Sequence, residues 1–111
     1  MEDGLHAIVS DRHVAVLVAE RQISLANIDI DYLGDGLWWL ARLKVREGYQ
    51  GQGMGSKILK RAQDELSALP HFLALEVAPG GYASDPIRLE KFYESHGFVR
   101  ENSGSFRWRK T

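Results

Sequence analysis

The sequence predicts a mixed α/β domain with a mostly antiparallel sheet of about six or seven strands and two main helices. Three observations indicate this fold. Four β-rich runs come first, over residues 5–9, 13–19, 23–32 and 37–46. A glycine-rich loop then leads into a stretch with apolar residues at helical spacing. A further apolar strand, a second helix and two short strands complete the order β-β-β-β-α-β-α-β-β, in which the first helix forms a β-α-β crossover.

Turn residues separate the first four runs. Residues 10–12 form a tight turn, and the Gly-Asp-Gly sequence at 34–36 makes a hairpin turn, because glycine takes positive φ at little cost. Within residues 23–32 the apolar positions change from odd to even near Ala26 and Asn27. One extra residue reverses the face that points inward, so we expect a β-bulge there.

The fourth run carries two neighbouring tryptophans. Trp38 and Trp39 point to opposite faces of this strand, so at least one of them is expected in the core. Arg42 and Lys44 are expected on one face of the strand. The odd positions are expected to share the other face; they are Trp39, Ala41, Leu43 and Val45.

The first helix follows the glycine-rich loop. Residues 54–68 have an apolar stripe at helical spacing, and Pro70 stops the helix. Residues 72–78 form a compact apolar run that reads as a buried strand. The Pro-Gly-Gly sequence at 79–81 is expected to break this strand.

The second helix has signals at both ends. Asp85 is a suitable N-cap, and Pro86 fits the first helical position. Gly97 sits where a left-handed C-cap would end the helix. Residues 98–100 and 105–109 are then the last two strands.

Length and composition exclude several classes of protein. The chain has 111 residues, so we expect residues 1–111 to form a single domain with its own core. Its net charge of −1 gives no general attraction to nucleic acid or to an anionic membrane. It contains no cysteine, which excludes disulfides, thiolate catalysis and Cys-ligated metals, and its 4 histidines share no metal-ligand spacing. No metal site is therefore predicted. The absence of a membrane-length apolar run and of a signal peptide indicates a reducing cytoplasm.

The loop over residues 48–55 is the strongest chemical signal. Its glycines let the backbone approach a ligand closely, and the first turn of the next helix offers N–H groups with a partial positive charge. Such a site suits a phosphate or pyrophosphate. The spacing Gly51-x-Gly53-x-Gly55 fits neither the P-loop nor the dinucleotide fingerprint. The alternative interpretation is a turn that only lets helix and strand pack closely.

Two motifs resemble the GNAT family of N-acetyltransferases. The sequence Gln50-x-x-Gly53-x-Gly55 matches the family's Gln/Arg-x-x-Gly-x-Gly/Ala signature, and the small–basic–apolar–apolar start of the helix continues it. Further along, residues 89–98 look like the family's second motif, an aromatic-Tyr helix that ends in Gly-Phe. The resemblance covers roughly residues 12–109.

The resemblance implies that acetyl-CoA binds where the strands at 37–46 and 72–78 splay apart. The backbone of the fourth strand would pair with the pantetheine arm through Leu43, Lys44 and Val45. Backbone amides of the loop would hold the pyrophosphate; these are Gln50, Gly51, Gln52, Gly53, Met54, Gly55 and Ser56. Tyr93 matches the tyrosine that protonates the leaving CoA thiolate, a form of general acid catalysis. The acetyl group would pass directly to an amine.

Three departures from the family pattern concern the acceptor side. The chain begins almost at the second strand of the usual fold, without the first strand and the two helices that often build the acceptor site. Pro86 stands where the family often has an asparagine, and the Leu-x-x-Phe-Tyr helix over residues 89–93 resembles that of small acetyltransferases of phages and mobile elements. The fourth strand has no carboxylate to act as a general base. A partner subunit or a macromolecular substrate is one way to complete the acceptor site.

Glu76 is the first candidate for the general base. It interrupts an apolar strand beside the expected cleft, an environment that suits acid–base chemistry. The alternative interpretation is an ion pair with a basic residue of a neighbouring strand. Asp29 and Asp31 are further candidates, with solvation on a strand face as their alternative. A chain of water molecules could replace all three.

Several other residues have structural alternatives. Tyr93 also fits a core aromatic beside Phe92, and His96 fits a residue favoured by the helix dipole better than a catalytic base. The basic residues near the helix start either form a solvated face or contact the CoA 3′-phosphate; they are Lys57, Lys60 and Arg61. The tryptophan that is not in the core lines the acceptor site or a dimer contact.

Together these features predict an acetyl-CoA-dependent N-acetyltransferase with Tyr93 and Glu76 as catalytic residues. Its partners would be acetyl-CoA and an amine acceptor, a small molecule or a protein lysine, with no nucleic acid and no membrane. The family often dimerises, so a homodimer is a candidate assembly. Two alternatives stay open, namely a module that binds CoA or another phosphate ligand without turnover, and a phage-type effector that acts on a host protein.

Overall fold

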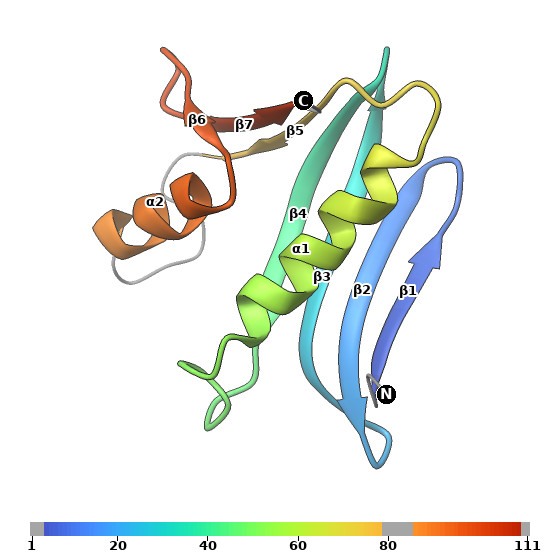
Figure 1. Ribbon diagram of the computed structural model, residues 1–111, viewed down its shortest axis with the longest axis vertical. Coiled ribbons are helices and arrows are strands. Elements are labelled where there is room, and N and C mark those ends of the chain that lie inside the picture. The colour runs from blue at the N-terminus through green and yellow to red at the C-terminus, as the bar shows by residue number, and fades with distance from the viewer. Residues whose placement is uncertain (1–3, 79–85, 110–111) are drawn as a thin grey trace.

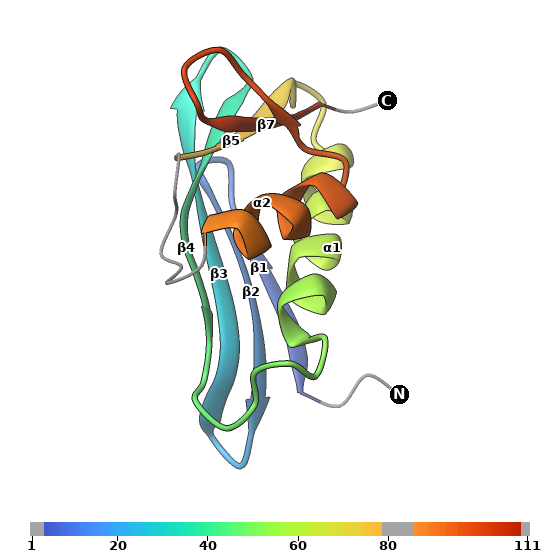
Figure 2. The same ribbon diagram turned by 90° about the vertical axis from the view of Figure 1, so that its left-hand side faces the viewer.

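A seven-stranded sheet with both helices on one face forms the architecture of this chain (Figures 1 and 2). The computed structural model describes residues 4–78 and 86–109. The strands are β1 (Leu5–Val9), β2 (His13–Glu20), β3 (Ile23–Gly34), β4 (Leu37–Val45), β5 (Ala74–Val77), β6 (Val99–Arg100) and β7 (Phe106–Arg109). The helices are α1 (Met54–Ser67) and α2 (Pro86–Ser95). The predicted mixed α/β class and element order are confirmed.

The sheet has the order β1-β2-β3-β4-β5-β7-β6. Strands β1 to β4 form an antiparallel meander joined by short turns, and β7 pairs antiparallel with both β5 and β6. The pair β4–β5 is parallel. A parallel pair needs a long crossover connection, and α1 supplies it.

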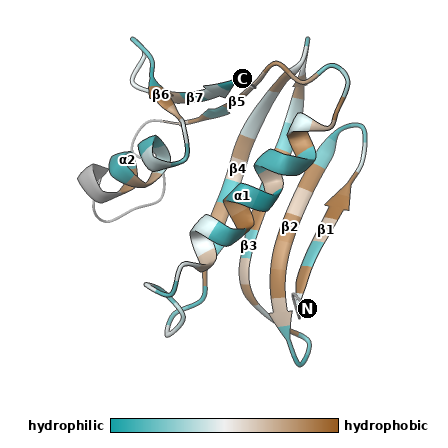
Figure 3. Cartoon of the chain, viewed as in Figure 1, coloured by the Kyte–Doolittle hydropathy of each residue, from teal (hydrophilic) through white to brown (hydrophobic). Residues whose placement is uncertain are grey.

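Helix α1 packs on the sheet through one apolar stripe. Its buried apolar side chains are Ile58, Leu59, Ala62 and Leu66. Facing strands β2 and β3 contribute the fully buried Val14, Val16, Ile28 and Ile30 to the same core. Figure 3 shows the polar side of α1 turned away from the sheet, as expected for an amphipathic surface helix. Among the described residues, no helix covers the other face of the sheet (Figure 2). We call that side the open face.

A β-bulge in β3 changes the phase of its side chains. Val18 of β2 pairs with Ala26, whereas Ala19 pairs with Ser24, so Leu25 is the extra residue. Leu25 and Ala26 are consecutive and both buried. The predicted bulge is therefore present, one residue before the expected position.

A second bulge, in β4, makes one sequence expectation wrong. Ile30 of β3 pairs with Leu40, whereas Asp29 pairs with Arg42, so Ala41 is an extra residue. On the N-terminal side of the bulge, the even positions Trp38 and Leu40 are buried. On its C-terminal side, the odd positions Leu43 and Val45 pack against the core. Trp39 and Ala41 therefore do not share a face with Leu43 and Val45, because the extra residue reverses the alternation.

The described residues at both ends of the second helix agree with the sequence prediction. Pro86 is the first residue of α2, and Gly97 follows the helix with φ of +87°. The predicted strand break at residues 79–81 and the N-cap Asp85 lie outside the described residues. Strand β5 covers Ala74–Val77 and is shorter than the strand predicted over residues 72–78. Leu73 belongs to the link before the strand, where its N–H donates to the Gly36 carbonyl oxygen of the β3–β4 turn.

Candidate functional site

The central strands β4 and β5 separate after a short pairing. Their parallel register ends at the pair Trp39–Glu76. Beyond this point β4 continues along the sheet, while β5 pairs only with β7 (Figure 1). The predicted pantetheine residues Leu43, Lys44 and Val45 lie on the diverging part of β4. An extended ligand chain can add to a strand edge of this kind through main-chain hydrogen bonds.

The connection from β4 to α1 is a glycine loop at positive φ. Gly48, Gly51 and Gly53 have φ of +91°, +79° and +80°. No heavy atom lies within 4 Å of a Cβ placed on any of the three, so the backbone faces open space there. The Gln50 side chain donates through Nε2 to the Val45 carbonyl oxygen at 3.3 Å. This hydrogen bond ties the loop to the end of β4.

Helix α1 begins without a side-chain cap. Its N-cap is Gly53, and the Lys57 N–H donates to the Gly53 carbonyl oxygen at 3.0 Å. The N–H groups of the first turn therefore have no acceptor inside the helix; they belong to Met54, Gly55 and Ser56. The helix dipole adds partial positive charge at this end. The predicted pyrophosphate residues 50–56, including Gln52, are thus gathered around one helix start that can accept an anion.

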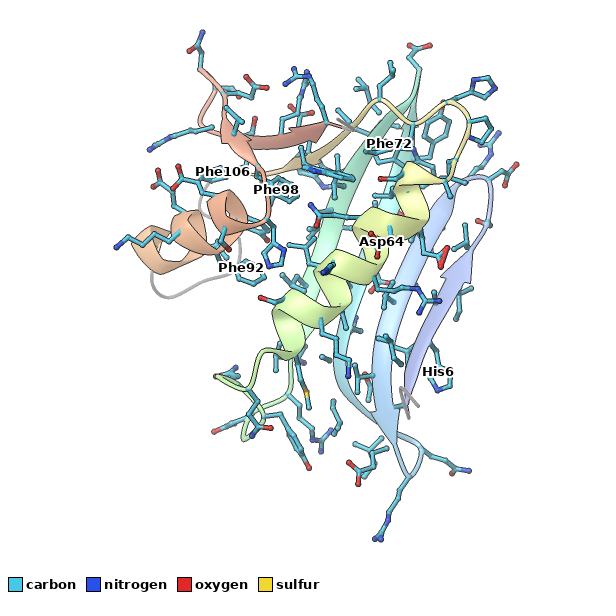
Figure 4. The ribbon with its side chains drawn as sticks, viewed as in Figure 1. His6, Asp64, Phe72, Phe92, Phe98 and Phe106 are labelled. Carbon is cyan, nitrogen blue, oxygen red and sulfur yellow. The ribbon has the colours of Figure 1, made fainter. Side chains whose placement is uncertain are left out.

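The end of α2 packs on the start of α1. A Cβ on Gly55 would stand 3.6 Å from Phe92 Cζ, and Figure 4 shows Phe92 between the two helices. His96 Nε2 lies 3.0 Å from Ser56 Oγ. Gln63 of α1 donates through Nε2 to the His96 carbonyl oxygen at 2.9 Å. Three contacts therefore fasten α2 to the helix that carries the glycine loop.

The surroundings of the His96 imidazole disfavour its protonated form. Burial lowers the pKa of His96, and the positive charge of Lys60 on α1 lowers it further. The ring also contacts Phe92 of α2, with centroids 5.0 Å apart. Arg61, which was a further candidate for phosphate contact, donates through Nε to Glu65 Oε1 at 3.0 Å. This i,i+4 ion pair agrees with the alternative interpretation of Arg61 as part of a solvated helix face.

Tyr93 lies in an aromatic cluster between α2 and the last strands. It is 2% exposed, and its ring centroid lies 5.2 Å from that of Phe98 and 5.9 Å from that of Phe106. Figure 4 shows these two phenylalanines beside α2. This packing is the core role weighed for Tyr93 from the sequence. Its function as the general acid stays a prediction.

Glu76 is paired on the open face. Arg107 of β7, its cross-strand neighbour, donates through Nη2 to Glu76 Oε1 at 2.9 Å. Glu101 Oε1 lies 3.7 Å from Arg107 Nε and 3.4 Å from Arg109 Nη2. The ion pair weighed as the alternative for Glu76 is therefore present. The carboxylate nevertheless lies at the last β4–β5 pair, where the strands begin to separate.

Most of the sequence matches a known domain. A profile described as "Acetyltransferase (GNAT) domain" matches residues 10–100. The chain belongs to the GNAT acetyltransferase family. No curated protein matches the sequence of this GNAT chain.

Solved structures of GNAT proteins share this fold. A GNAT acetyltransferase from Elizabethkingia anophelis with acetyl-CoA bound is 11% identical with TM-score 0.73, over 96% of this chain and 97% of that one. The ribosomal-protein-S18-alanine N-acetyltransferase from Escherichia coli is 19% identical with TM-score 0.70, over 96% and 81%. The PaiA N-acetyltransferase from Thermoplasma acidophilum, in complex with coenzyme A, is 14% identical with TM-score 0.70, over 89% and 62%. At these identities the likeness concerns the fold.

The open face of this GNAT sheet holds a polar cluster that sequence analysis did not connect. His13 Nδ1 lies 2.8 Å from Asp31 Oδ1, and His13 Nε2 lies 3.3 Å from Asp29 Oδ1. Asn27 donates through Nδ2 to Asp29 Oδ2 at 3.0 Å. Asp29 and Asp31 are thus partnered rather than only solvated. Only the β2–β3 register makes His13 their neighbour, so no spacing along the sequence signals this contact.

The two tryptophans divide as expected between the faces of the sheet. Trp38 is 3% exposed and belongs to the core. Trp39 is in register with Asp31 on one side and with Glu76 on the other. Trp39 therefore lies on the open face between Asp31 and Glu76, at the point where β4 and β5 begin to separate.

Residues 4–78 and 86–109 contain neither a metal-binding cluster nor a membrane-spanning helix. No group of three His, Asp or Glu residues in these ranges is placed to hold a metal ion. Over the same part of the chain, no helix has the length and apolar character needed to cross a membrane.

Proposed function

We propose that this GNAT chain transfers an acetyl group from acetyl-CoA directly to an amine. The observation that carries the proposal is the open glycine loop at the start of α1, next to a strand pair that separates after Trp39–Glu76, in a chain of this family. Acetyl-CoA is the cosubstrate, and the reaction needs no metal. The reducing cytoplasm is the compartment that we propose, because the chain lacks cysteine.

The binding roles follow the geometry of the loop and the strand. The pyrophosphate would accept hydrogen bonds from backbone N–H groups over residues 50–56. The pantetheine arm would extend from the loop along Leu43–Val45 toward the point of strand separation. This path leads the thioester toward the level of Trp39 and Glu76, where the sheet opens.

The chemistry is a balanced acyl transfer. The amine nitrogen attacks the thioester carbonyl carbon, the C–N bond forms and the C–S bond breaks. Tyr93 would donate its hydroxyl proton to the leaving thiolate. The amine must lose a proton, and Glu76 or a water chain would accept it. Glu76 can serve only if the Arg107 contact at 2.9 Å leaves one carboxylate oxygen available.

The acceptor is expected on the open face. Asp31, Trp39 and Glu76 lie side by side there in the cross-strand register. An amine that approaches from this side meets the thioester without crossing the helices. The acceptor is a small-molecule amine or a protein lysine, and a homodimer is a candidate assembly.

Substituting Glu76→Gln tests the base directly. We expect kcat to fall by about 10²-fold or more if Glu76 accepts the amine proton, since an amide cannot do so. The Kd for acetyl-CoA should stay within about twofold, because the loop is untouched. Steady-state kinetics and calorimetric titration measure the two quantities. A kcat equal to that of the wild type would exclude Glu76 and favour the water chain.

The melting temperature with excess acetyl-CoA, CoA or ATP tests the cosubstrate. A ligand at about 100 times its Kd adds about 2.7 kcal/mol of stability. For a domain of this size the shift is on the order of 10 °C. We expect it with both CoA species and not with ATP. No shift with either CoA species would overturn the acyl-CoA site.

A CoA-binding module without turnover is the second candidate. The Glu76–Arg107 pair favours it, because it engages the first candidate for the base. Such a module would bind acetyl-CoA but release no CoA in the presence of any amine. A CoA-release assay with polyamines, aminoglycosides, amino acids and lysine peptides separates the two functions, and a phage-type effector would need a protein acceptor.

A further inference from the structure

The side chain of His96 reaches the group of residues that would hold the pyrophosphate. Ser56 is the third residue of α1 and contributes one of the first-turn N–H groups. Its Oγ is also 3.0 Å from His96 Nε2. A histidine just after α2 therefore contacts the hydroxyl at the start of α1. The two family motifs read from the sequence contain these residues but assign no contact between them.

The direction of this hydrogen bond decides what Ser56 can offer to a ligand. A hydroxyl has one proton and two acceptor lone pairs. If His96 Nε2 carries the proton and donates it, the Ser56 proton is left for a phosphate oxygen. If Nε2 accepts instead, the Ser56 proton is used internally. An anion at the start of α1 favours the first arrangement, because it needs donors around it.

The surroundings of His96 hold it in place. Its carbonyl oxygen accepts from Gln63, which is only 8% exposed. Its ring packs against Phe92, which in turn lies against Gly55. A shift of His96 would therefore disturb α1 both at Gly55, beside the loop, and at Gln63, farther along the helix. Gly97, the next residue, has φ of +87°, and a Cβ there would make a tight contact of 3.3 Å with Trp108 Cδ1.

We propose that His96 is a positioning residue of the acyl-CoA site, which holds the Ser56 hydroxyl as a donor to the CoA pyrophosphate and takes up a proton when the pyrophosphate binds. The proposal rests on the proposed function. It adds a residue of the turn after α2 to a phosphate site otherwise made of backbone groups.

The sign of the proton linkage follows from the charges that face His96. In the free protein, burial and Lys60 of α1 lower the His96 pKa. The other side chains that contact its ring or backbone do not titrate; they are Ser56, Gln63 and Phe92. A bound pyrophosphate adds negative charge near Ser56 and raises the pKa again. Binding therefore takes up a proton, and affinity should rise as the pH falls.

The experiment measures dephospho-CoA binding to the full chain by calorimetry at pH 7.5 and pH 5.5. Dephospho-CoA keeps the pyrophosphate but lacks the 3′-phosphate, which titrates near pH 6 and would confuse the result. We expect the wild-type Kd to be about threefold to tenfold lower at pH 5.5. His96→Gln keeps an amide donor but cannot titrate. Its Kd should stay within about threefold of the wild-type Kd at pH 7.5 and should not change with pH.

His96→Leu and Ser56→Ala remove the two ends of the contact. Each should raise the Kd for dephospho-CoA about fivefold to tenfold at pH 7.5. The Kd of the double variant should not exceed the higher of the two single-variant values, because the same interaction is lost in all three proteins. His71→Gln is the matched control. His71 is an exposed histidine beyond the C-terminal end of α1. Binding of dephospho-CoA to the His71→Gln variant should therefore keep the full pH dependence of the wild type.

The outcomes separate this proposal from the one on which it rests. A His96→Gln variant with the wild-type pH dependence, or additive effects of Ser56→Ala and His96→Leu, would overturn the role of His96 alone. If wild-type protein does not bind dephospho-CoA or CoA, the acyl-CoA site is wrong and this role falls with it. Melting curves check each variant, and if His96→Leu does not fold, the comparison of His96→Gln with wild type decides.

Discussion

A glutamate at Gly53 is expected to raise the Kd for acetyl-CoA by 100-fold or more. Gly53 is the N-cap of α1 with φ of +80°, and a Cβ placed there meets no atom within 4 Å. The new side chain would therefore extend into the space beside the first-turn N–H groups. At about 5 Å from a phosphate and an effective dielectric constant of about 20, its charge costs about 3 kcal/mol, which is about 100-fold in Kd. Calorimetric titration with acetyl-CoA measures the change.

Gly53→Asn is the matched control for this prediction. Asparagine tolerates positive φ better than most residues and brings a similar Cβ without a charge. Its Kd should rise by less than about tenfold. If both variants bind as weakly as each other, strain or bulk at the N-cap explains the loss. Unimpaired binding by Gly53→Glu would place the anion elsewhere and remove the pyrophosphate role from this loop.

The order of strands and helices could be predicted because local signals agree with the final fold. The Gly-Asp-Gly turn at 34–36, the glycine loop before Met54 and the Pro86 start of α2 each act within a few residues. Hydrophobic periodicity also identified the stripe of α1. Such signals depend on backbone preferences that do not require knowledge of distant partners.

The alternation of β4 shows where local reasoning stops. Trp39 and Ala41 were expected to share a face with Leu43 and Val45, but the bulge at Ala41 separates them. No residue near Ala41 marks the bulge in the sequence. It is defined by the register with β3, in which Arg42 opposes Asp29 and Leu40 opposes Ile30. A register of this kind is a property of two strands together.

The candidate site divides in the same way. That residues 50–56 surround one helix start could be predicted because they are contiguous, and their role in binding the pyrophosphate stays a prediction. The pairing of Glu76 with Arg107 was only one of two readings of the sequence. The contacts of His96 with Ser56 and of His13 with Asp31 join residues far apart in the chain. Docking of α2 on α1 and the β2–β3 register bring them together.

Tyr93→Phe is expected to lower kcat by about 10²- to 10⁴-fold while acetyl-CoA binding persists. The predicted role of the hydroxyl is to protonate the leaving thiolate, and phenylalanine cannot do so. The aromatic cluster should keep its packing, because the ring that contacts Phe98 and Phe106 is retained. Stopped-flow or steady-state release of CoA measures the rate, and calorimetry measures the Kd.

Tyr32→Phe separates this effect from the loss of another tyrosine hydroxyl, one that is partly buried against the core. Tyr32 Oη accepts a hydrogen bond from Gly36 N–H at 3.0 Å in the β3–β4 turn. Losing that bond should cost about 1 kcal/mol of stability and leave kcat unchanged. A general acid at Tyr93 requires the opposite pattern, a large loss of kcat at nearly constant Kd. If Tyr93→Phe lowers only the melting temperature, Tyr93 is a core residue and the thiolate takes its proton from another group or from water.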